Sequence, residues 1–234
     1  TNLAQAVRDA ILAGPVNRRE LAKLAAGVDP SDSLAMKQID EAAELGIYMA
    51  ARSIIERGMS TEDTFDALVE LYGNQPNLTA KDSTSKVNQA YSTPTPLSYA
   101  AGMAADLANA TFAWDGTAGN GLLTIAADPS RVIVNEINPD RLANLERIGF
   151  ARITQEDATT ISAPEGVDRQ ALNPPFGQIL SGGEPKTWPI YTRQDGVVVM
   201  TKAIDHAIAM KSLESLPEDG RAVLILGGRK GTDA

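Results

Sequence analysis

The residues best suited to chemistry begin with the glycine-rich segment Asp115–Gly121, which reads Asp-Gly-Thr-Ala-Gly-Asn-Gly. It directly follows the apolar run Thr111–Trp114. Because glycine has no Cβ, a strand that runs into such a loop lets a ligand lie close to the main chain. A small zwitterionic ligand would suit it, with the Asp115 carboxylate accepting from an ammonium group or a nearby backbone amide. A glycine-rich loop alone is also typical of an ordinary turn.

Three further polar features follow the loop along the chain. Glu136 comes about twenty residues later, the spacing at which dinucleotide-binding folds place an acid that accepts from two ribose hydroxyls. Asp157 offers a carboxylate that can accept from an adenine amino group. The tetrapeptide Asn173-Pro174-Pro175-Phe176 then combines a side-chain amide with an aromatic ring. Together these groups predict a site for a nucleoside.

Strands and helices alternate after residue 110, and they must position these groups. We expect strands over 111–115, 131–136, 151–154, 167–172 and 221–226, helices over 122–127, 139–148 and 203–216, and a long loop over 177–194. This alternation predicts an α/β fold with a parallel, doubly wound sheet. The polar features all follow strands, so we expect them along the edge formed by the carboxyl ends.

The first 73 residues have a different pattern. Apolar residues recur at helical spacing in four stretches, which end at Gly14, Gly27, Gly58 and Gly73. We therefore expect an all-α N-terminal domain over 1–73, with a packing or adaptor role. Residues 74–90 are polar and aperiodic and are interpreted as a linker. The segment 91–97 then leads, through two prolines, into a helix that ends near Ala108 and opens the α/β domain, residues 91–234.

Composition excludes several classes of function. The 234 residues include no cysteine, so the chain forms neither disulfides nor thiolate metal sites, and the single histidine rules out a multi-histidine metal centre. No run of about 18 apolar residues predicts a membrane span. The lack of cysteine fits a reducing cytosol. The net charge is −9, so any nucleic-acid partner would need a local basic surface or a basic region on another segment.

The combined order of these motifs resembles S-adenosylmethionine-dependent methyltransferases that methylate amines. Their signature, (Asn/Asp/Ser)-Pro-Pro-(Tyr/Phe/Trp), is matched in full by Asn173–Phe176. The resemblance implies that the Asn side-chain carbonyl and a proline-fixed backbone carbonyl accept from a poorly nucleophilic amine, while the aromatic residue stacks on the planar target. It also implies a class I methyltransferase fold, which is Rossmann-like.

A second match narrows the family. Tyr91-Ser92-Thr93-Pro94 resembles the Tyr-x-Thr-Pro motif that precedes the cofactor loop in gamma-order N6-adenine DNA methyltransferases. The modification subunits of type I restriction systems belong to this group, and they also carry a helical N-terminal domain and an Asn-Pro-Pro-Phe-Gly run. Similar domains occur in phage or plasmid proteins fused to helicase-like regions. The resemblance covers about residues 88–228.

The resemblance implies roles for individual residues. Binding of S-adenosyl-L-methionine is implied for Tyr91, Thr93, Asp115, Gly116, Ala118, Gly119, Gly121, Glu136, Ile137, Asp157, Ala158 and Asn173. Catalytic roles are implied for Asn173, Pro174, Pro175 and Phe176, and no metal ligand is implied. DNA is the implied partner, read with help from a recognition domain or subunit, and helicase or restriction subunits are possible associates. The implied location is the bacterial cytoplasm, for a bacterial or a phage-encoded protein.

The sequence also departs from the family pattern. Gly116 stands where a proline usually follows the first acidic residue, and the fourth predicted strand contains the polar residues Asp168, Arg169 and Gln170. A full methyltransferase sheet has seven strands, whereas five are predicted here. We therefore expect the sheet to be incomplete at its C-terminal end, and no target-recognition domain is recognisable.

Other interpretations stay open. The same tetrapeptide serves enzymes that methylate guanine N2 in ribosomal RNA or a glutamine of a protein release factor. A catalytically silent, methylase-like scaffold would fit the acidic charge, and a plain NAD-binding domain would leave the tetrapeptide unexplained. Asp157 also suits a simple helix cap. Trp188 and Tyr191 suit either stacking on a flipped base or packing within the loop that contains them.

Overall fold

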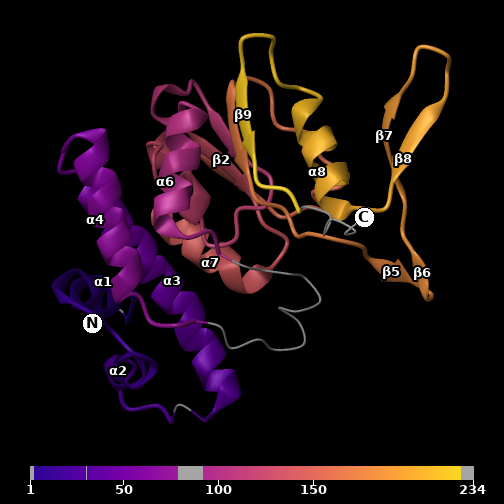
Figure 1. Ribbon diagram of the computed structural model, residues 1–234. Coiled ribbons are helices and arrows are strands. Elements are labelled where there is room, and N and C mark those ends of the chain that lie inside the picture. Colours follow the sequence, from indigo (N-terminus) through magenta and orange to yellow (C-terminus); the bar gives the residue numbers. More distant parts are fainter. Residues whose placement is uncertain (1–2, 30, 79–91, 228–234) are drawn as a thin grey trace, which may run out of the picture.

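The computed structural model describes residues 3–29, 31–78 and 92–227, and its N-terminal part is a group of helices (Figure 1). These helices are α1 (Leu3–Ala13), α2 (Arg18–Leu24), α3 (Ser33–Ile55) and α4 (Thr61–Asn74). Two of these helices have capped starts: Ser60 Oγ accepts from the Asp63 amide at the start of α4, and Asn17 forms a capping box with Glu20 at the start of α2. No helix in the described ranges is long and apolar enough to cross a membrane.

The second part is mixed α/β and contains a five-stranded sheet in which every pair of strands is parallel. Its strands are β1 (Ala113–Asp115), β2 (Val132–Asn135), β3 (Arg152–Thr154), β4 (Arg169–Leu172) and β9 (Arg221–Leu224). The spatial order is β3-β2-β1-β4-β9, so the direction of winding reverses between β1 and β4. This arrangement is compatible with a Rossmann-like fold, in which ligands bind at the carboxyl ends of the strands beside such a reversal.

Three helices accompany the sheet: α6 (Thr95–Ala104), α7 (Pro139–Ile148) and α8 (Ile204–Leu213). Single 3₁₀ turns lie at Leu107–Asn109, Leu122–Thr124 and Pro129–Arg131. The helix expected over 122–127 is therefore only a short turn. One cluster of buried apolar side chains runs from α1 and α3 through α6 to β1 and β2, so the N-terminal helices and the sheet share a core.

The loop expected over 177–194 was a wrong prediction, because two antiparallel pairs of strands occupy this region. They are β5 (Leu180–Ser181) with β6 (Glu184–Pro185), and β7 (Trp188–Thr192) with β8 (Val198–Thr201). Positive φ angles at Gly182, Gly183 and Gly196 make the tight turns possible. In Figure 1 the β7–β8 hairpin projects away from the parallel sheet.

The polar fourth strand is accommodated by specific hydrogen bonds. Gln170 is fully buried, and its Nε2 donates to the Ser212 carbonyl (3.0 Å) while Ser212 Oγ donates to its Oε1 (2.9 Å). The Arg169 guanidinium lies 3.7 Å from a carboxylate oxygen of Asp106 and 3.6 Å from one of Asp168. These contacts offset part of the penalty for burying polar groups in β4, where Arg169 Nε is buried without a hydrogen-bond partner among the described residues, and Ser212 attaches α8 to the sheet.

Candidate functional site

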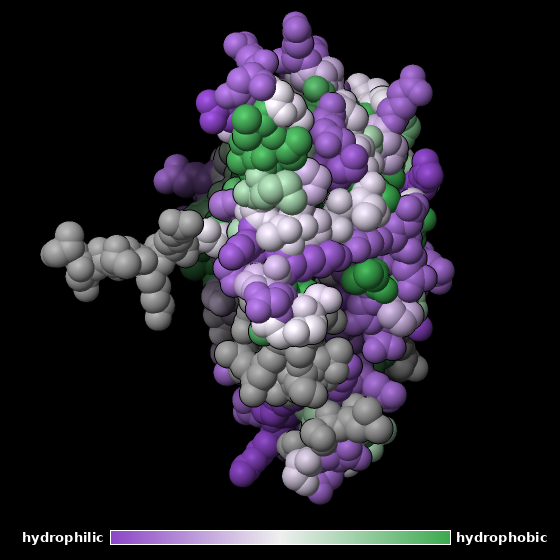
Figure 2. Space-filling model, turned by 90° about the vertical axis from the view of Figure 1, so that its right-hand side faces the viewer, coloured by the Kyte–Doolittle hydropathy of each residue, from purple (hydrophilic) through white to green (hydrophobic). Residues whose placement is uncertain are grey.

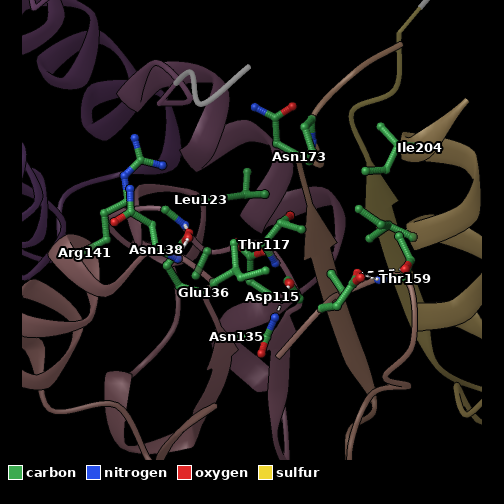
Figure 3. A pocket seen from close by; sticks show the side chains of 18 of the residues that line it. Asp115, Thr117, Leu123, Asn135, Glu136, Asn138, Arg141, Thr159, Asn173 and Ile204 are labelled. Carbon is green, nitrogen blue, oxygen red and sulfur yellow. Dashed lines mark hydrogen bonds between the residues drawn. The ribbon is translucent and has the colours of Figure 1, made fainter. Parts of the chain in front are cut away.

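A cavity of about 320 Å³ lies at the carboxyl ends of β1, β2 and β4. It collects most of the residues that the sequence predicts for the site: Thr93, Asp115, Gly116, Ala118, Gly119, Glu136, Ile137, Asp157, Ala158, Asn173 and Pro175. In Figure 3, Asp115 and Glu136 lie centrally, Asn138 and Arg141 to one side, and Thr159 and Ile204 to the other. The parallel sheet brings these residues together because each follows the end of a strand.

Hydrogen bonds and steric contacts fix the backbone conformation of the glycine loop. Asp115 Oδ1 accepts from the Thr117 amide (2.9 Å), and the Ala118 amide donates to the Asn135 carbonyl of β2 (2.9 Å). Gly121 has a φ of +82°, and a Cβ there would lie 3.0 Å from the Phe150 ring. Both its conformation and this close contact therefore require glycine.

Glu136 braces the loop from the end of β2. Its Oε2 accepts from the Gly119 amide (2.8 Å), and its Oε1 accepts from the Asn138 amide (2.7 Å). The side chain is buried, and burial raises its pKa. Each carboxylate oxygen has a further lone pair, so this geometry leaves Glu136 able to accept from ligand hydroxyls.

Asp115 is the most perturbed acid of the cavity wall. Burial, with a smaller contribution from the Glu136 charge, raises the pKa of Asp115 to about 7. Its exposed fraction is 1%. An acid with a shifted pKa in a cavity is a feature of functional sites. A cation bound beside Asp115 would favour the ionised form of its carboxyl group.

Asp157 has a local partner as well as a place in the wall. Its Oδ1 accepts from both the backbone amide (2.9 Å) and the hydroxyl (2.7 Å) of Thr159. These bonds close a local turn, so the helix cap that the sequence left open as an alternative is not formed: residues 158–160 are a turn and no helix begins there. Asp157 is exposed at the rim of the cavity, so the turn bonds and a ligand contact are compatible.

Asn173 is oriented by Thr93. Its Nδ2 donates to Thr93 Oγ1 (3.0 Å), whereas its Oδ1 is buried and accepts no hydrogen bond from any described residue. An unsatisfied buried amide oxygen is costly in a folded protein. Because Asn173 lines the cavity, a donor on a ligand is the natural partner for this oxygen.

Some predicted residues lie elsewhere. Pro174, Phe176 and Gly121 are not among the residues that line the cavity. Phe176 instead packs close to Gly227, where a Cβ would lie 3.2 Å from Phe176 Cβ. The stacking role implied for Phe176 therefore has no support in this arrangement. Tyr91 lies outside the described residues.

The structure adds a wall of which the sequence singles out only Trp188, as a candidate either for stacking on a flipped base or for packing; Tyr191, the other candidate, does not line the cavity. Ile179, Lys186 and Trp188 reach the cavity from the β5–β8 region, and Ile204 and Ile208 reach it from α8. The Lys186 ammonium lies 5.3 Å from the centre of the Trp188 ring, within range of a cation–π interaction. The Asp195-Gly196 dipeptide was the available sequence signal for a hairpin.

The charges around the cavity are mainly acidic. Four carboxylates line it, from Asp115, Glu136, Glu156 and Asp157, against the cations of Arg141 and Lys186. Arg141 Nε lies 3.5 Å from a carboxylate oxygen of Glu41, so part of its charge is already compensated. The cavity is thus better suited to a ligand with positive charge than to a polyphosphate.

Comparison with known proteins returns no matching family model, no similar curated protein and no similar solved structure. Within residues 3–29, 31–78 and 92–227, no group of histidine and acidic side chains is arranged to hold a metal ion. The fold and the cavity geometry therefore carry the functional argument.

Proposed function

We propose that this chain is an S-adenosylmethionine-dependent methyltransferase that modifies the N6 amine of adenine in DNA. The observation that carries the proposal is the state of Asn173. Its Nδ2 is engaged by Thr93, and its buried Oδ1 is left to accept from a ligand in the cavity. A conjugated ring amine is a poor nucleophile that needs such an acceptor, which the (Asn/Asp/Ser)-Pro-Pro-aromatic signature supplies in the resembling family.

The cavity fits a sulfonium cofactor better than a dinucleotide. S-adenosylmethionine carries positive charge on its sulfur and ammonium, and the cavity presents the buried acids Asp115 and Glu136. A pyrophosphate usually sits at the N-terminus of a long helix that follows the glycine loop. Here the loop leads only into the 3₁₀ turn Leu122–Thr124, so the NAD alternative lacks its phosphate site.

The residues divide the work between binding and orientation. S-adenosylmethionine, when bound, supplies an electrophilic methyl group. The glycine loop and Glu136 would hold its methionine and ribose portions, and Asp115 would compensate its positive charge. Asn173 Oδ1 would accept from the amine, which concentrates the lone pair on the nitrogen. The amine proton can pass to water, so no histidine or cysteine base is required.

Adenine in DNA is favoured as the acceptor by the link between two motifs. Thr93, from the Tyr-x-Thr-Pro segment, is the residue that orients Asn173. Enzymes acting on guanine in RNA or on protein glutamine generally lack this segment. With a net charge of −9, we expect most of the DNA backbone contacts to come from a basic region or subunit beyond this domain.

The proposal is tested by methyl transfer from labelled S-adenosylmethionine to DNA that lacks adenine methylation, followed by mass spectrometry of the nucleosides. We expect N6-methyladenine with the wild-type chain. Asn173→Ala should reduce transfer by roughly 100-fold or more while it leaves cofactor affinity within a few-fold. Asn109→Ala removes an exposed asparagine that does not line the cavity and serves as the control.

Parallel reactions with RNA and with glutamine-containing peptides identify a different acceptor. Label found only there would retain methyl transfer and overturn the choice of DNA. Full transfer by Asn173→Ala would contradict the role of the tetrapeptide.

A further inference from the structure

A polar network joins the N-terminal helices to two segments beside the cavity, the glycine loop and the segment that orients Asn173. It centres on Glu44, a partly buried residue of α3, whose Oε2 accepts from Ser92 Oγ and from Asn120 Nδ2 (3.1 Å). Ser92 precedes Thr93, which orients Asn173. Asn120 belongs to the glycine loop, between Gly119 and Gly121. One carboxylate oxygen therefore contacts both the segment that orients Asn173 and the loop beside Glu136.

A second acid of α3 completes the hold on Asn120. The Asn120 Nδ2 also donates to Glu41 Oε2 (2.7 Å), and its Oδ1 accepts from Asn144 Nδ2 (2.8 Å). Asn144, on α7, donates in addition to the Glu41 backbone carbonyl (2.8 Å). Both polar atoms of the Asn120 side chain are thus engaged, and the loop cannot shift without breaking bonds to α3 and α7.

The charge pattern makes a purely packing role a poor explanation for this network. Glu41 and Glu44 lie close enough to interact unfavourably, with Arg141 as the cation facing both. Well-packed apolar residues usually stabilise a junction as well as buried charges do. What the charged groups add is a fixed orientation, because each hydrogen bond specifies the direction of its partner.

We infer that Glu44 is a positioning residue of the methyl-transfer site, which sets the glycine loop and the Thr93–Asn173 pair relative to one another. The inference rests on the proposed function, since it assigns Glu44 a part in that same site. Glu44 touches neither cofactor nor acceptor and acts through Ser92 and Asn120. On this account the helical region is a structural part of the active site as well as a packing partner.

The test compares Glu44→Ala and Glu44→Gln with Asp40→Asn. Asp40 lies on the same helix and accepts from Arg18 Nη2 (3.0 Å), so its substitution removes a partly buried ion pair within the helical region only. We expect Glu44→Ala to lower kcat by roughly tenfold with a smaller change in the KM for DNA, because ground-state contacts to DNA are unaffected. Glu44→Gln keeps one acceptor oxygen and should restore part of the rate.

Hydrogen exchange provides a readout that does not depend on activity. We expect Glu44→Ala to speed amide exchange in residues 92–98 and 116–124, and Asp40→Asn to leave both segments unchanged. Equal kcat and equal exchange for Glu44→Ala and Asp40→Asn would overturn the inference. If the wild-type chain neither binds cofactor nor transfers methyl groups, the proposed function fails, while the exchange result still decides whether Glu44 anchors the two segments.

Discussion

The cavity has two walls of opposite character. The glycine-loop wall, Asp115–Gly121 with Glu136, is buried and tied by backbone and side-chain hydrogen bonds to β2 and α3. The other wall, called here the hairpin wall, is formed by β5 to β8. Its residues Lys186 and Trp188 line the cavity, but much of the rest of its surface is exposed. Figure 2 shows this side of the molecule, where hydrophobic residues lie among hydrophilic ones. The exposed large apolar residues of this wall are Leu180, Tyr191, Val197, Val198 and Met200.

The difference indicates two roles. A wall held in one conformation suits a ligand that is the same in every turnover, because its binding groups need no reorganisation. A protruding hairpin with few buried contacts can adjust to a larger partner. We therefore expect the glycine-loop wall to hold the cofactor and the hairpin wall to meet the acceptor.

The largest expected effect comes from a substitution at Gly121 that disrupts the glycine-loop wall. Gly121→Ala combines a left-handed backbone with a clash against Phe150, so we expect the free energy of unfolding to fall by about 3 kcal/mol. Cofactor affinity should be largely lost. Gly196→Ala, in the hairpin turn, has a similar φ of +81° but no atom within 4 Å of the new Cβ. It should cost only about 1 kcal/mol and leave cofactor affinity unchanged.

Denaturant unfolding and calorimetric titration measure both quantities for the two glycine variants. Equal losses of stability and affinity would contradict the distinction between the walls, because only the backbone strain is common to the two positions.

The hairpin wall should loosen independently when Trp188 is removed. Trp188 is 7% exposed and is the buried residue of β7, whereas Tyr191 on the same strand is 51% exposed. We expect Trp188→Ala to reduce local stability over residues 184–201 by about 2 kcal/mol, measured by hydrogen exchange, with no change at 116–124. Tyr191→Ala is the matched control and should have little effect. Faster exchange in the glycine loop of Trp188→Ala would show that the walls are coupled.

The smallest expected effect is the dependence of stability and of cofactor affinity on pH, through Asp115 in the glycine-loop wall. The folded pKa of Asp115, about 7, lies above its ordinary value of 3.8. Between these values the folded protein binds a proton that the unfolded chain lacks, so this group's contribution to stability falls as pH rises toward 7. Ionised Asp115 attracts a cation, so cofactor affinity should rise by roughly tenfold from about pH 6 to about pH 8. Asp115→Asn should flatten this profile. If calorimetric titrations of Asp115→Asn give the same dependence of cofactor affinity on pH as the wild-type chain, Asp115 is not the group responsible.

The sequence predicts the residues of the glycine-loop wall better than those of the hairpin wall. Alternating strands and helices are local patterns, and parallel strands place their carboxyl ends together, so Asp115, Glu136 and Asn173 were expected to meet. Strands β5 to β8 are short and interrupted by Pro185 and Pro189, which obscures their periodicity. The hairpins consequently resembled a loop.

Contacts between distant segments were beyond prediction for another reason. Glu44 is 48 residues from Ser92, and nothing in the helical pattern of α3 distinguishes an acid that faces a cavity wall from one that faces solvent. Phe176 illustrates the converse, because a motif fixes residue types while tertiary packing decides where an aromatic ring points. In the described structure the base of the Phe176 side chain lies against Gly227, and Phe176 does not line the cavity.

The most direct test of the central claim is a calorimetric titration of the wild-type chain with S-adenosylmethionine, S-adenosylhomocysteine and NAD under one set of conditions. The acidic cavity predicts saturable one-to-one binding of S-adenosylmethionine, weaker binding of the homocysteine analogue at low salt because it lacks the sulfonium charge, and no binding of NAD. Absence of S-adenosylmethionine binding, or a preference for NAD, would contradict the account.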